Sequence, residues 1–376
     1  MSRLRRVLSA RTTLDIRTLV LAGILCAIIG TAVLYAGVKL GRRARFEYVM
    51  WSGLRLNRSA WEAGFLERNL PVPPEGPRDG YWGRRIGVHV VDPQLGWVLP
   101  EMHFPGLLET DKLGMQHVTT SVPPVAHVLI MGASTAFGGY ASSIERTYFH
   151  QVAKQLEAAG VPVRITVYAT GAWKSTQELK ALRLHGRDVK PDLVLFLDGL
   201  NDITNGSNAH SLYNEPTTTL DGSRWHPLYN EHDYQQRAAL FVSNMNEAYE
   251  DLHRDDVPLV VALQPALFEK PMLSPIETVV ERESLRYYGD KAGLHAVYEQ
   301  VRQGLRELAS KPGAYFIDAS RVFNHESKTI FTDVWHFSDP GHTILATAIA
   351  PPLVKIIRTR GGQAKTSPPN GEARVQ

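Results

Sequence analysis

A serine in a tight turn of small residues is the first candidate for chemistry. The segment HVLIMG, residues 127–132, is a short apolar run typical of a buried strand, and GAST, residues 132–135, follows it directly. Ser134 therefore stands at the carboxyl end of a strand, where backbone N–H groups can face an anion. The G-x-S-x-G nucleophile elbow is absent because Ala136 occupies the position of its second glycine. Taken alone, such a tetrapeptide is more often a plain turn.

An aspartate and a histidine separated by two residues form the second candidate. Asp333 and His336 lie in FTDVWHFSDPGH, between the last expected strand and the last expected helix. An aspartate at this spacing can orient one imidazole nitrogen while the other faces a hydroxyl nucleophile. One alternative is that the pair caps the following helix. Another is a metal site made of Asp333, His336, Asp339 and His342, which no further His/Cys cluster supports.

Asn201 and Gly171 follow two more expected strands. Asn201 lies in GLND, directly after DLVLFLDG, residues 192–199, and could project its amide at the sheet edge that carries Ser134. Gly171 follows VRITVYAT, residues 163–170. Each of them, alone, is typical of ordinary turn chemistry. Their joint order along the chain, serine, glycine, asparagine and then Asp-x-x-His, is more informative than any single member.

The elements that must position these residues indicate an α/β fold. Short apolar runs alternate with amphipathic stretches, which is the pattern of a parallel sheet covered by helices. Two further strands are expected at residues 257–265 and 314–322, and helices at residues 145–159, 175–189, 234–254 and 292–309, with a last helix after Pro340. We therefore expect a three-layer, flavodoxin-like α/β/α sandwich around a five-stranded parallel sheet.

In this arrangement the chain resembles the SGNH, or GDSL-like, hydrolase family over about residues 126–357. Ala133 and Thr135 replace the aspartate and leucine of the family's name motif, and Ala169 stands where an asparagine often precedes the glycine. None of these changes removes a reacting group. The resemblance implies an SGNH hydrolase fold and an ester-bond hydrolase, either a serine esterase or an acyltransferase.

The resemblance also implies a role for each candidate residue. Ser134 is the expected nucleophile, and His336 and Asp333 complete a catalytic triad. Gly171 and Asn201 are expected to form the oxyanion hole together with the backbone N–H of Ser134. This chemistry requires no cofactor and no metal ion, and its partner is a small-molecule, glycan or lipid acyl ester.

Residues 19–38 predict a transmembrane anchor. They are twenty consecutive uncharged residues, the length that crosses a bilayer as a helix. Residues 1–18 form a basic tail with five arginines, but residues 39–45 are basic as well, so the charge barely favours an inside N-terminus. A cleaved signal peptide is the alternative, although its apolar part is usually shorter. We expect a single-pass protein of the bacterial inner membrane whose catalytic domain is extracytoplasmic.

The distribution of charge gives no reason to expect nucleic-acid binding. Residues 1–45 carry nine Lys and Arg against one acidic residue, which leaves 32 basic and 37 acidic residues in the rest of the chain. The excess positive charge thus belongs to the anchor region, and the globular part is slightly acidic.

The remaining segments are expected to be accessory. Residues 39–125 form a stalk and lead-in segment, residues 126–358 the catalytic domain, and residues 359–376 a disordered tail. Residues 203–233 and 266–290 are long connections that predict binding loops or lids. Aromatic and histidine side chains that could line a sugar or acyl site, or simply pack in the core, are Trp173, Trp225, His226 and Tyr229.

Two functions remain open from the sequence. One is a membrane-anchored serine esterase or acyltransferase acting on esters such as O-acylated envelope glycans or lipids. The alternative is a catalytically inactive module of the same fold that binds glycan or scaffolds an envelope assembly complex. The joint presence of Ser134, Asn201, Asp333 and His336 favours the enzyme.

Overall fold

Most of the residues that the structure describes lie from residue 55 onward. The computed structural model describes residues 55–73, 89–106, 108–204, 231–288 and 290–366, together with scattered positions between 21 and 37. The chain divides into two units, Met1–Arg55 and Leu56–Gln376. Nine of the twenty positions of the expected anchor, residues 19–38, lie outside the described residues, and none of the described helices has the length and apolar character that a bilayer crossing requires.

Six strands form one mixed sheet in the described part of the second unit. In spatial order they are β10 (Ala314–Ile317), β9 (Leu259–Leu263), β8 (Leu193–Asp198), β6 (Ala126–Gly132), β7 (Val163–Ala169) and β5 (Gln116–Thr119). Strands β10 to β7 are parallel, whereas β5 pairs with β7 in the antiparallel direction.

The five expected strands are confirmed, but the expectation of a five-stranded, purely parallel sheet is wrong. The sixth strand, β5, comes from the segment expected to be a stalk and lead-in. Its four residues, QHVT, place Gln116 and Val118 toward the core and leave His117 and Thr119 exposed. Such a short alternation, with a polar residue at one core position, is too weak a pattern to be recognised in a sequence.

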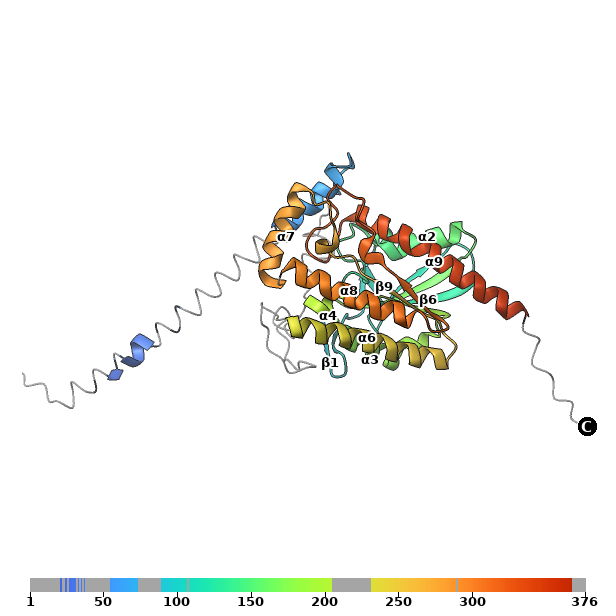
Figure 1. The fold of residues 1–376 in the computed structure, drawn as a ribbon, viewed down its shortest axis with the longest axis horizontal. Helices are drawn as coiled ribbons and strands as arrows, with labels where there is room; N and C mark the ends of the chain where they lie inside the picture. The colour runs from blue at the N-terminus through green and yellow to red at the C-terminus, as the bar shows by residue number, and fades with distance from the viewer. Residues whose placement is uncertain are drawn as a thin grey trace, which may run out of the picture. The chain divides into compact units, whose positions relative to one another are not determined.

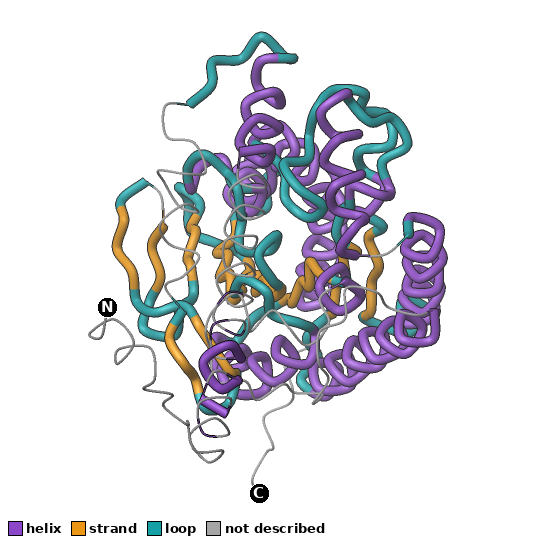
Figure 2. The backbone as a smooth tube through the Cα atoms, turned by 90° about the vertical axis from the view of Figure 1, so that its left-hand side faces the viewer, coloured by secondary structure: helices purple, strands orange, loops and turns teal. Residues whose placement is uncertain are grey.

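Helices cover both faces of the sheet, and Figure 2 shows the strands as a layer between them. One hydrophobic core packs Val128 and Ile130 of β6 against a first layer of helices. A second hydrophobic core packs Leu129 and Met131 against a second layer, on the opposite face of the sheet. The first layer contains α2 (Tyr148–Ala158) and α9 (Asp339–Thr366), and the second contains α3 (Ser175–Ala181), α6 (Glu231–Arg254) and α8 (Lys291–Leu308) (Figure 1). Because β6 is buried on both faces from Val128 onward, its sequence there, VLIMG, is continuously apolar. The three-layer α/β/α arrangement is confirmed.

A helix that the sequence analysis did not anticipate follows β9. Residues 266–290, expected to be a long loop, contain a short 3-10 turn, Leu267–Glu269, and α7 (Pro275–Tyr288). The start of α7 is a capping box: Glu277 N–H donates to Ser274 Oγ at 3.3 Å, and Ser274 N–H donates to Glu277 Oε2 at 2.9 Å. Ser-Pro-x-Glu is the sequence signature of such a helix start.

The lead-in segment folds onto the catalytic domain in the residues that the structure describes. Residues 55–66 are helical, β1 (Val90–Asp92) pairs with β2 (Gly96–Val98), and β3 (Met102–Phe104) pairs with β4 (Leu108–Thr110). Trp61 and Trp97 are almost fully buried in the two cores. These residues are therefore part of the domain rather than a stalk.

The end of the chain also differs from expectation. Helix α9 continues to Thr366, past residue 359 where we expected disorder to begin. Leu353 and Ile356 pack in the core, and Arg360 pairs with Asp256 at 2.7 Å, so the helix gains tertiary contacts late in its length. Most of the other long connection, residues 205–230, lies outside the described residues.

Candidate active site

Ser134 lies in the turn that follows the central strand β6. Gly132 adopts φ +149°, and a Cβ there would lie 2.5 Å from the carbonyl oxygen of Leu197, so only glycine fits this approach to β8. The chain then coils, with Phe137 N–H donating to Ala133 O at 2.9 Å and Gly139 N–H donating to Ser134 O at 3.0 Å. Ser134 is thereby held at the carboxyl edge of the sheet with 8% of its surface exposed.

Asp333 and His336 meet Ser134 in one chain of hydrogen bonds. His336 Nδ1 lies 2.7 Å from Asp333 Oδ2, and His336 Nε2 lies 2.8 Å from Ser134 Oγ. The other Asp333 oxygen accepts hydrogen bonds from the backbone N–H groups of Trp335 (2.8 Å) and His336 (2.7 Å). These bonds fix the carboxylate, so the imidazole presents Nε2 to the serine hydroxyl. The sequence placed these three side chains together, and the structure brings them together.

Two backbone contacts tie the loop that carries Asp333 and His336 to its surroundings. Thr135 Oγ1 donates to Trp335 O at 3.3 Å, which links this loop to the nucleophile turn. Leu267 N–H donates to Val334 O at 3.1 Å, which links it to the 3-10 turn after β9. The loop is therefore supported from two sides of the sheet edge.

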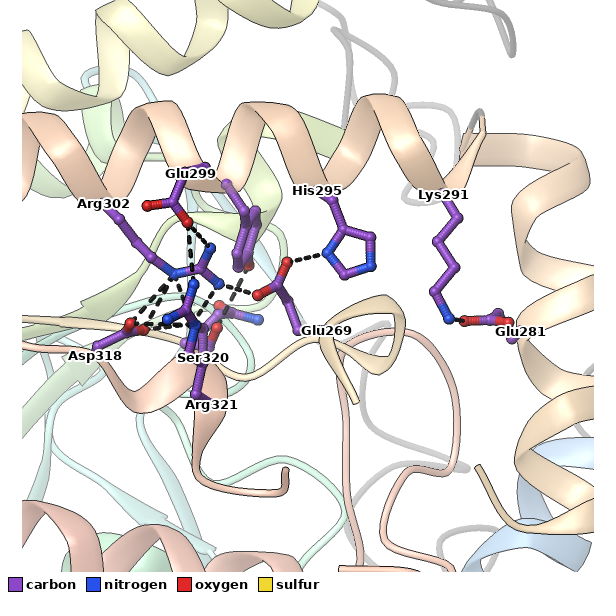
Figure 3. A network of polar contacts seen from close by, with 11 residues as sticks. Glu269, Glu281, Lys291, His295, Glu299, Arg302, Asp318, Ser320 and Arg321 are labelled. Atoms are coloured by element: carbon purple, nitrogen blue, oxygen red, sulfur yellow. Dashed lines mark hydrogen bonds and ion pairs between the residues drawn. The ribbon is translucent and has the colours of Figure 1, made fainter. Parts of the chain in front are cut away.

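The 3-10 turn is itself held by a network of charged side chains (Figure 3). Arg302, which is buried on α8, forms an ion pair with Glu269 at the end of the turn. His295 Nδ1 lies 2.6 Å from the same carboxylate, and Arg302 also pairs with Asp318 at 3.2 Å. A buried charge requires partners of this kind, and they leave Glu269 few alternative positions.

Gly171 and Asn201 follow the two strands that flank β6. Gly171 follows β7 and Asn201 lies in α4 (Leu200–Thr204) directly after β8, and these two strands are the neighbours of β6. Asn201 is 4% exposed, and its Nδ2 donates to Trp173 O at 3.0 Å. Both residues thus stand at the sheet edge that the sequence analysis assigned to them.

Two tryptophans brace the Gly171 loop. Trp97 Nε1 of β2 donates to Gly171 O at 2.9 Å, and Trp173 Nε1 donates to Trp97 O at 2.8 Å. Trp173 is fully buried, so core packing is its role rather than lining a substrate site. Trp225, His226 and Tyr229, the other residues considered for that lining, lie outside the described residues.

Tyr140 is a site residue that the sequence analysis missed. Its ring stacks on the His336 imidazole, with centroids 4.8 Å apart and an interplanar angle of 23°. Its backbone adopts φ +66°, and its carbonyl accepts a hydrogen bond from Trp61 Nε1 at 2.9 Å. The Gly-Gly-Tyr sequence after the nucleophile turn carries no signal for this stacking, because the contact joins segments far apart in the chain.

Three carboxyl groups are buried next to one another on α3, β8 and α4, namely those of Glu178, Asp198 and Asp202. Asp202 accepts hydrogen bonds from Ser175 N–H (3.0 Å) and Ser175 Oγ (2.5 Å). Burial, and then the charge of Asp198, raises the pKa of Glu178 well above its usual value, and burial followed by the charge of Asp202 does the same to the pKa of Asp198. In both groups burial is the largest cause, and it favours the neutral, protonated form of the carboxyl over the charged one.

Two members of the alternative metal set, Asp339 and His342, bond to groups outside that set. Asp339 accepts hydrogen bonds from Ser142 N–H (2.8 Å) and Ser142 Oγ (2.6 Å), and His342 Nε2 donates to Gly139 O at 2.9 Å. No group of three or more His, Cys, Asp or Glu side chains within the described ranges is arranged to hold a metal ion. Burial lowers the pKa of His342 to about 4, so this imidazole is neutral at pH 7.

Several solved structures are similar to this chain at low sequence identity. They include the acetyl xylan esterase AlAXEase (16% identity, 60% of this chain and 99% of that one, TM-score 0.42). A lipase/acylhydrolase from Enterococcus faecalis matches at 15% identity over 62% and 97% of the two chains (TM-score 0.42). The acetylxylan esterase Axe2 from Geobacillus stearothermophilus matches at 15% identity over 63% and 96% (TM-score 0.38).

A comparison with curated proteins finds no match. The profile of the GDSL-like Lipase/Acylhydrolase family matches residues 130–344, which is more than half of the chain and includes Ser134, Gly171, Asn201, Asp333 and His336. The chain therefore belongs to the GDSL-like lipase/acylhydrolase family and is an ester hydrolase.

Proposed function

We propose that the chain is a membrane-anchored serine esterase in which Ser134 attacks the acyl carbon, His336 is the general base and Asp333 orients the imidazole. One observation carries the proposal: Ser134 Oγ, the two ring nitrogens of His336 and Asp333 form a continuous hydrogen-bonded series with contacts of 2.8 and 2.7 Å. This is the geometry that an activated serine requires.

The steps follow from the chemistry of these groups. As Ser134 Oγ bonds to the ester carbonyl carbon, its proton passes to His336 Nε2, and the negative charge of Asp333 stabilises the imidazolium. Collapse of the tetrahedral intermediate breaks the ester C–O bond, and the leaving alcohol takes the proton from His336. Water, or the hydroxyl of an acyl acceptor, then attacks the acyl-enzyme with His336 again acting as base, so hydrolysis and acyl transfer share this site.

The oxyanion of the tetrahedral intermediate needs hydrogen-bond donors that are already in place. We assign this role to the side-chain amide of Asn201 and the backbone N–H groups of Gly171 and Ser134. Support comes from the strand order, since β7 and β8 flank β6 and present Gly171 and Asn201 on either side of Ser134.

Labelling of the full-length chain with a fluorophosphonate probe tests the nucleophile. We expect one probe per chain on Ser134, no labelling of Ser134→Ala, and no turnover of p-nitrophenyl acetate by that variant. Ser142→Ala is the matched control, because Ser142 bonds to Asp339 and not to His336. Near-normal turnover by Ser134→Ala would refute the assignment.

The substrate and the location belong to the same proposal. The uncharged run of residues 19–38 supports an anchor in a bacterial inner membrane with an extracytoplasmic catalytic domain, which would bring the site to O-acylated envelope glycans or lipids. Fractionation of cells, followed by protease treatment of intact spheroplasts, should place the chain in the membrane and digest its catalytic domain. Rates on acetylated oligosaccharides and on long-chain esters then identify the acyl group.

A further inference from the structure

A carboxylate outside the Ser134, His336 and Asp333 series holds the loop on which two of them lie. Glu277, in the first turn of α7, is fully buried. Its Oε1 accepts hydrogen bonds from the backbone N–H groups of Ile330 (2.9 Å) and Phe331 (3.0 Å), two positions just before Asp333. We propose that Glu277 is a positioning residue of the esterase, which sets the direction of the Asp333–His336 pair toward Ser134. This inference rests on the proposed function.

The second oxygen of Glu277 is held as firmly as the first. Lys270 Nζ donates to Oε2 in an ion pair whose two side chains have no exposed surface, and Ser274 N–H donates to Oε2 at 2.9 Å. Lys270 Nζ also donates to Lys328 O at 2.8 Å. With four donors on one buried carboxylate, its orientation is fixed, and both charges of the ion pair contact the segment that leads to Asp333.

Backbone hydrogen bonds within the loop connect Ile330 and Phe331 to the segment that carries Asp333 and His336. Ser338 N–H donates to Ile330 O at 3.1 Å, and Thr332 N–H donates to His336 O at 2.8 Å. Phe331 and Phe337 form an isolated antiparallel bridge. These bonds close the loop between residues 330 and 338, with Asp333 and His336 inside it. A shift of Ile330 and Phe331 therefore moves the imidazole relative to Ser134.

Glu277 also takes part in the capping box of α7, and this second role must be separated from positioning. Thr278→Ala removes a hydroxyl of the same first turn, which donates to Ser274 O at 3.0 Å and is exposed, and it leaves Glu277 in place. Glu281→Gln changes a charge on the same helix, where Glu281 pairs with Lys291 of α8 at 2.6 Å and not with the catalytic loop (Figure 3). These two variants control for helix stability and for charge.

Glu277→Gln is the informative change because an amide has one acceptor oxygen where the carboxylate has two. One pair of donors, either the N–H groups of Ile330 and Phe331 or those of Lys270 and Ser274, then faces an N–H₂ group. Lys270→Met, which removes the ammonium group that fixes Oε2, is a second variant with the same expected outcome if Glu277→Gln does not fold.

The experiment measures kcat and KM on p-nitrophenyl acetate, and the low-field proton resonance of the His336 Nδ1–H, at a temperature where circular dichroism shows every full-length variant folded. We expect Glu277→Gln to lower kcat about tenfold or more with KM nearly unchanged, and to shift or broaden the resonance. Thr278→Ala and Glu281→Gln should keep both at wild-type values.

Two results would overturn the inference. One is a folded Glu277→Gln variant with wild-type kcat and an unchanged resonance, and the other is a Thr278→Ala variant that loses as much kcat as Glu277→Gln. If the wild type shows no turnover that depends on Ser134, the proposed function fails. The resonance still reports in that case whether Glu277 sets the position of the imidazole.

Discussion

The indole N–H of Trp97 donates a hydrogen bond to the carbonyl oxygen of Gly171 across 74 positions of the chain. Trp97 lies in the lead-in segment and Gly171 lies in the loop after β7, beside the Ser134 turn. The family profile begins only at residue 130, so the brace for a loop of the candidate site comes from outside the matched region. The lead-in segment is thus part of what makes the site.

Trp97→Phe should weaken this brace. The substitution keeps most of the ring packing and leaves the buried Gly171 carbonyl without its donor, which costs about 1 to 3 kcal/mol. Urea unfolding should show this loss, and kcat should fall because the Gly171 N–H is displaced. Val91→Thr, an exposed change on the same hairpin, should alter neither quantity. Unchanged stability and kcat in Trp97→Phe would show that the bond is dispensable.

Asn201→Ala should keep a small fraction of the wild-type activity. Loss of one oxyanion donor typically removes about 3 kcal/mol of transition-state stabilisation, so kcat should fall roughly a hundredfold. The control is Asn246→Ala, because Asn246 lies on α6 and bonds to Val242 O and Lys311. Steady-state rates on p-nitrophenyl acetate, with labelling by the fluorophosphonate probe as a check on Ser134, measure the effect. An Asn201→Ala rate equal to the wild type would remove Asn201 from the oxyanion hole.

The buried imidazole of His342 predicts a loss of stability in acid. Its folded pKa of about 4 lies below the unfolded value of 6.5. As the pH falls from 6.5 to 4, the unfolded chain therefore binds a proton at His342 that the folded chain does not, and the folded state loses stability. The wild type should therefore lose about 3 kcal/mol between pH 7 and pH 4 through this group. In His342→Gln that part of the loss should vanish, as urea unfolding at both pH values can measure. The exposed His103→Gln is the control, and parallel pH curves for His342→Gln and the wild type would contradict the expectation.

Glu178 predicts the opposite pH dependence. Its folded pKa is raised by burial and by Asp198, so its contribution to stability is complete below the unfolded value and is lost as the pH rises toward the folded one. Glu178→Gln, which keeps the shape and cannot ionise, should therefore gain in thermal midpoint relative to the wild type from pH 5 to pH 9. The control is Glu307→Gln on the exposed side of α8. A constant difference between Glu178→Gln and the wild type over this range would exclude the buried protonated carboxyl.

Much of the sheet was predictable because its strands are apolar on both faces. Runs such as LVLFLD in β8 and LVVAL in β9 are typical of strands that a parallel sheet buries on both faces. Once these strands are ordered, the ends of β6, β7 and β8 fall at one edge, and Ser134, Gly171 and Asn201 fall there with them. The Asp-x-x-His spacing supplied the rest of the expected site.

The features that the sequence could not predict depend on contacts between segments far apart in the chain. The Ser-Pro-x-Glu start of α7 was visible in the sequence, but the bonds from Ile330 and Phe331 to Glu277 span more than fifty positions and leave no local pattern. The same holds for Tyr140, whose stacking on His336 follows from the left-handed turn and not from residue type. Polar tertiary contacts of this kind have no periodicity to detect.

The antiparallel strand β5 has a practical consequence for fragments of the protein. It covers the outer ladder of β7, and Gln116 reaches from it to Phe137 O at 3.2 Å. A fragment cut to residues 130–344 would leave the N–H and C=O groups of β7 open to a neighbouring molecule, which is how sheets join into aggregates. Soluble expression of this enzyme therefore depends on a boundary well upstream of the region that its family shares.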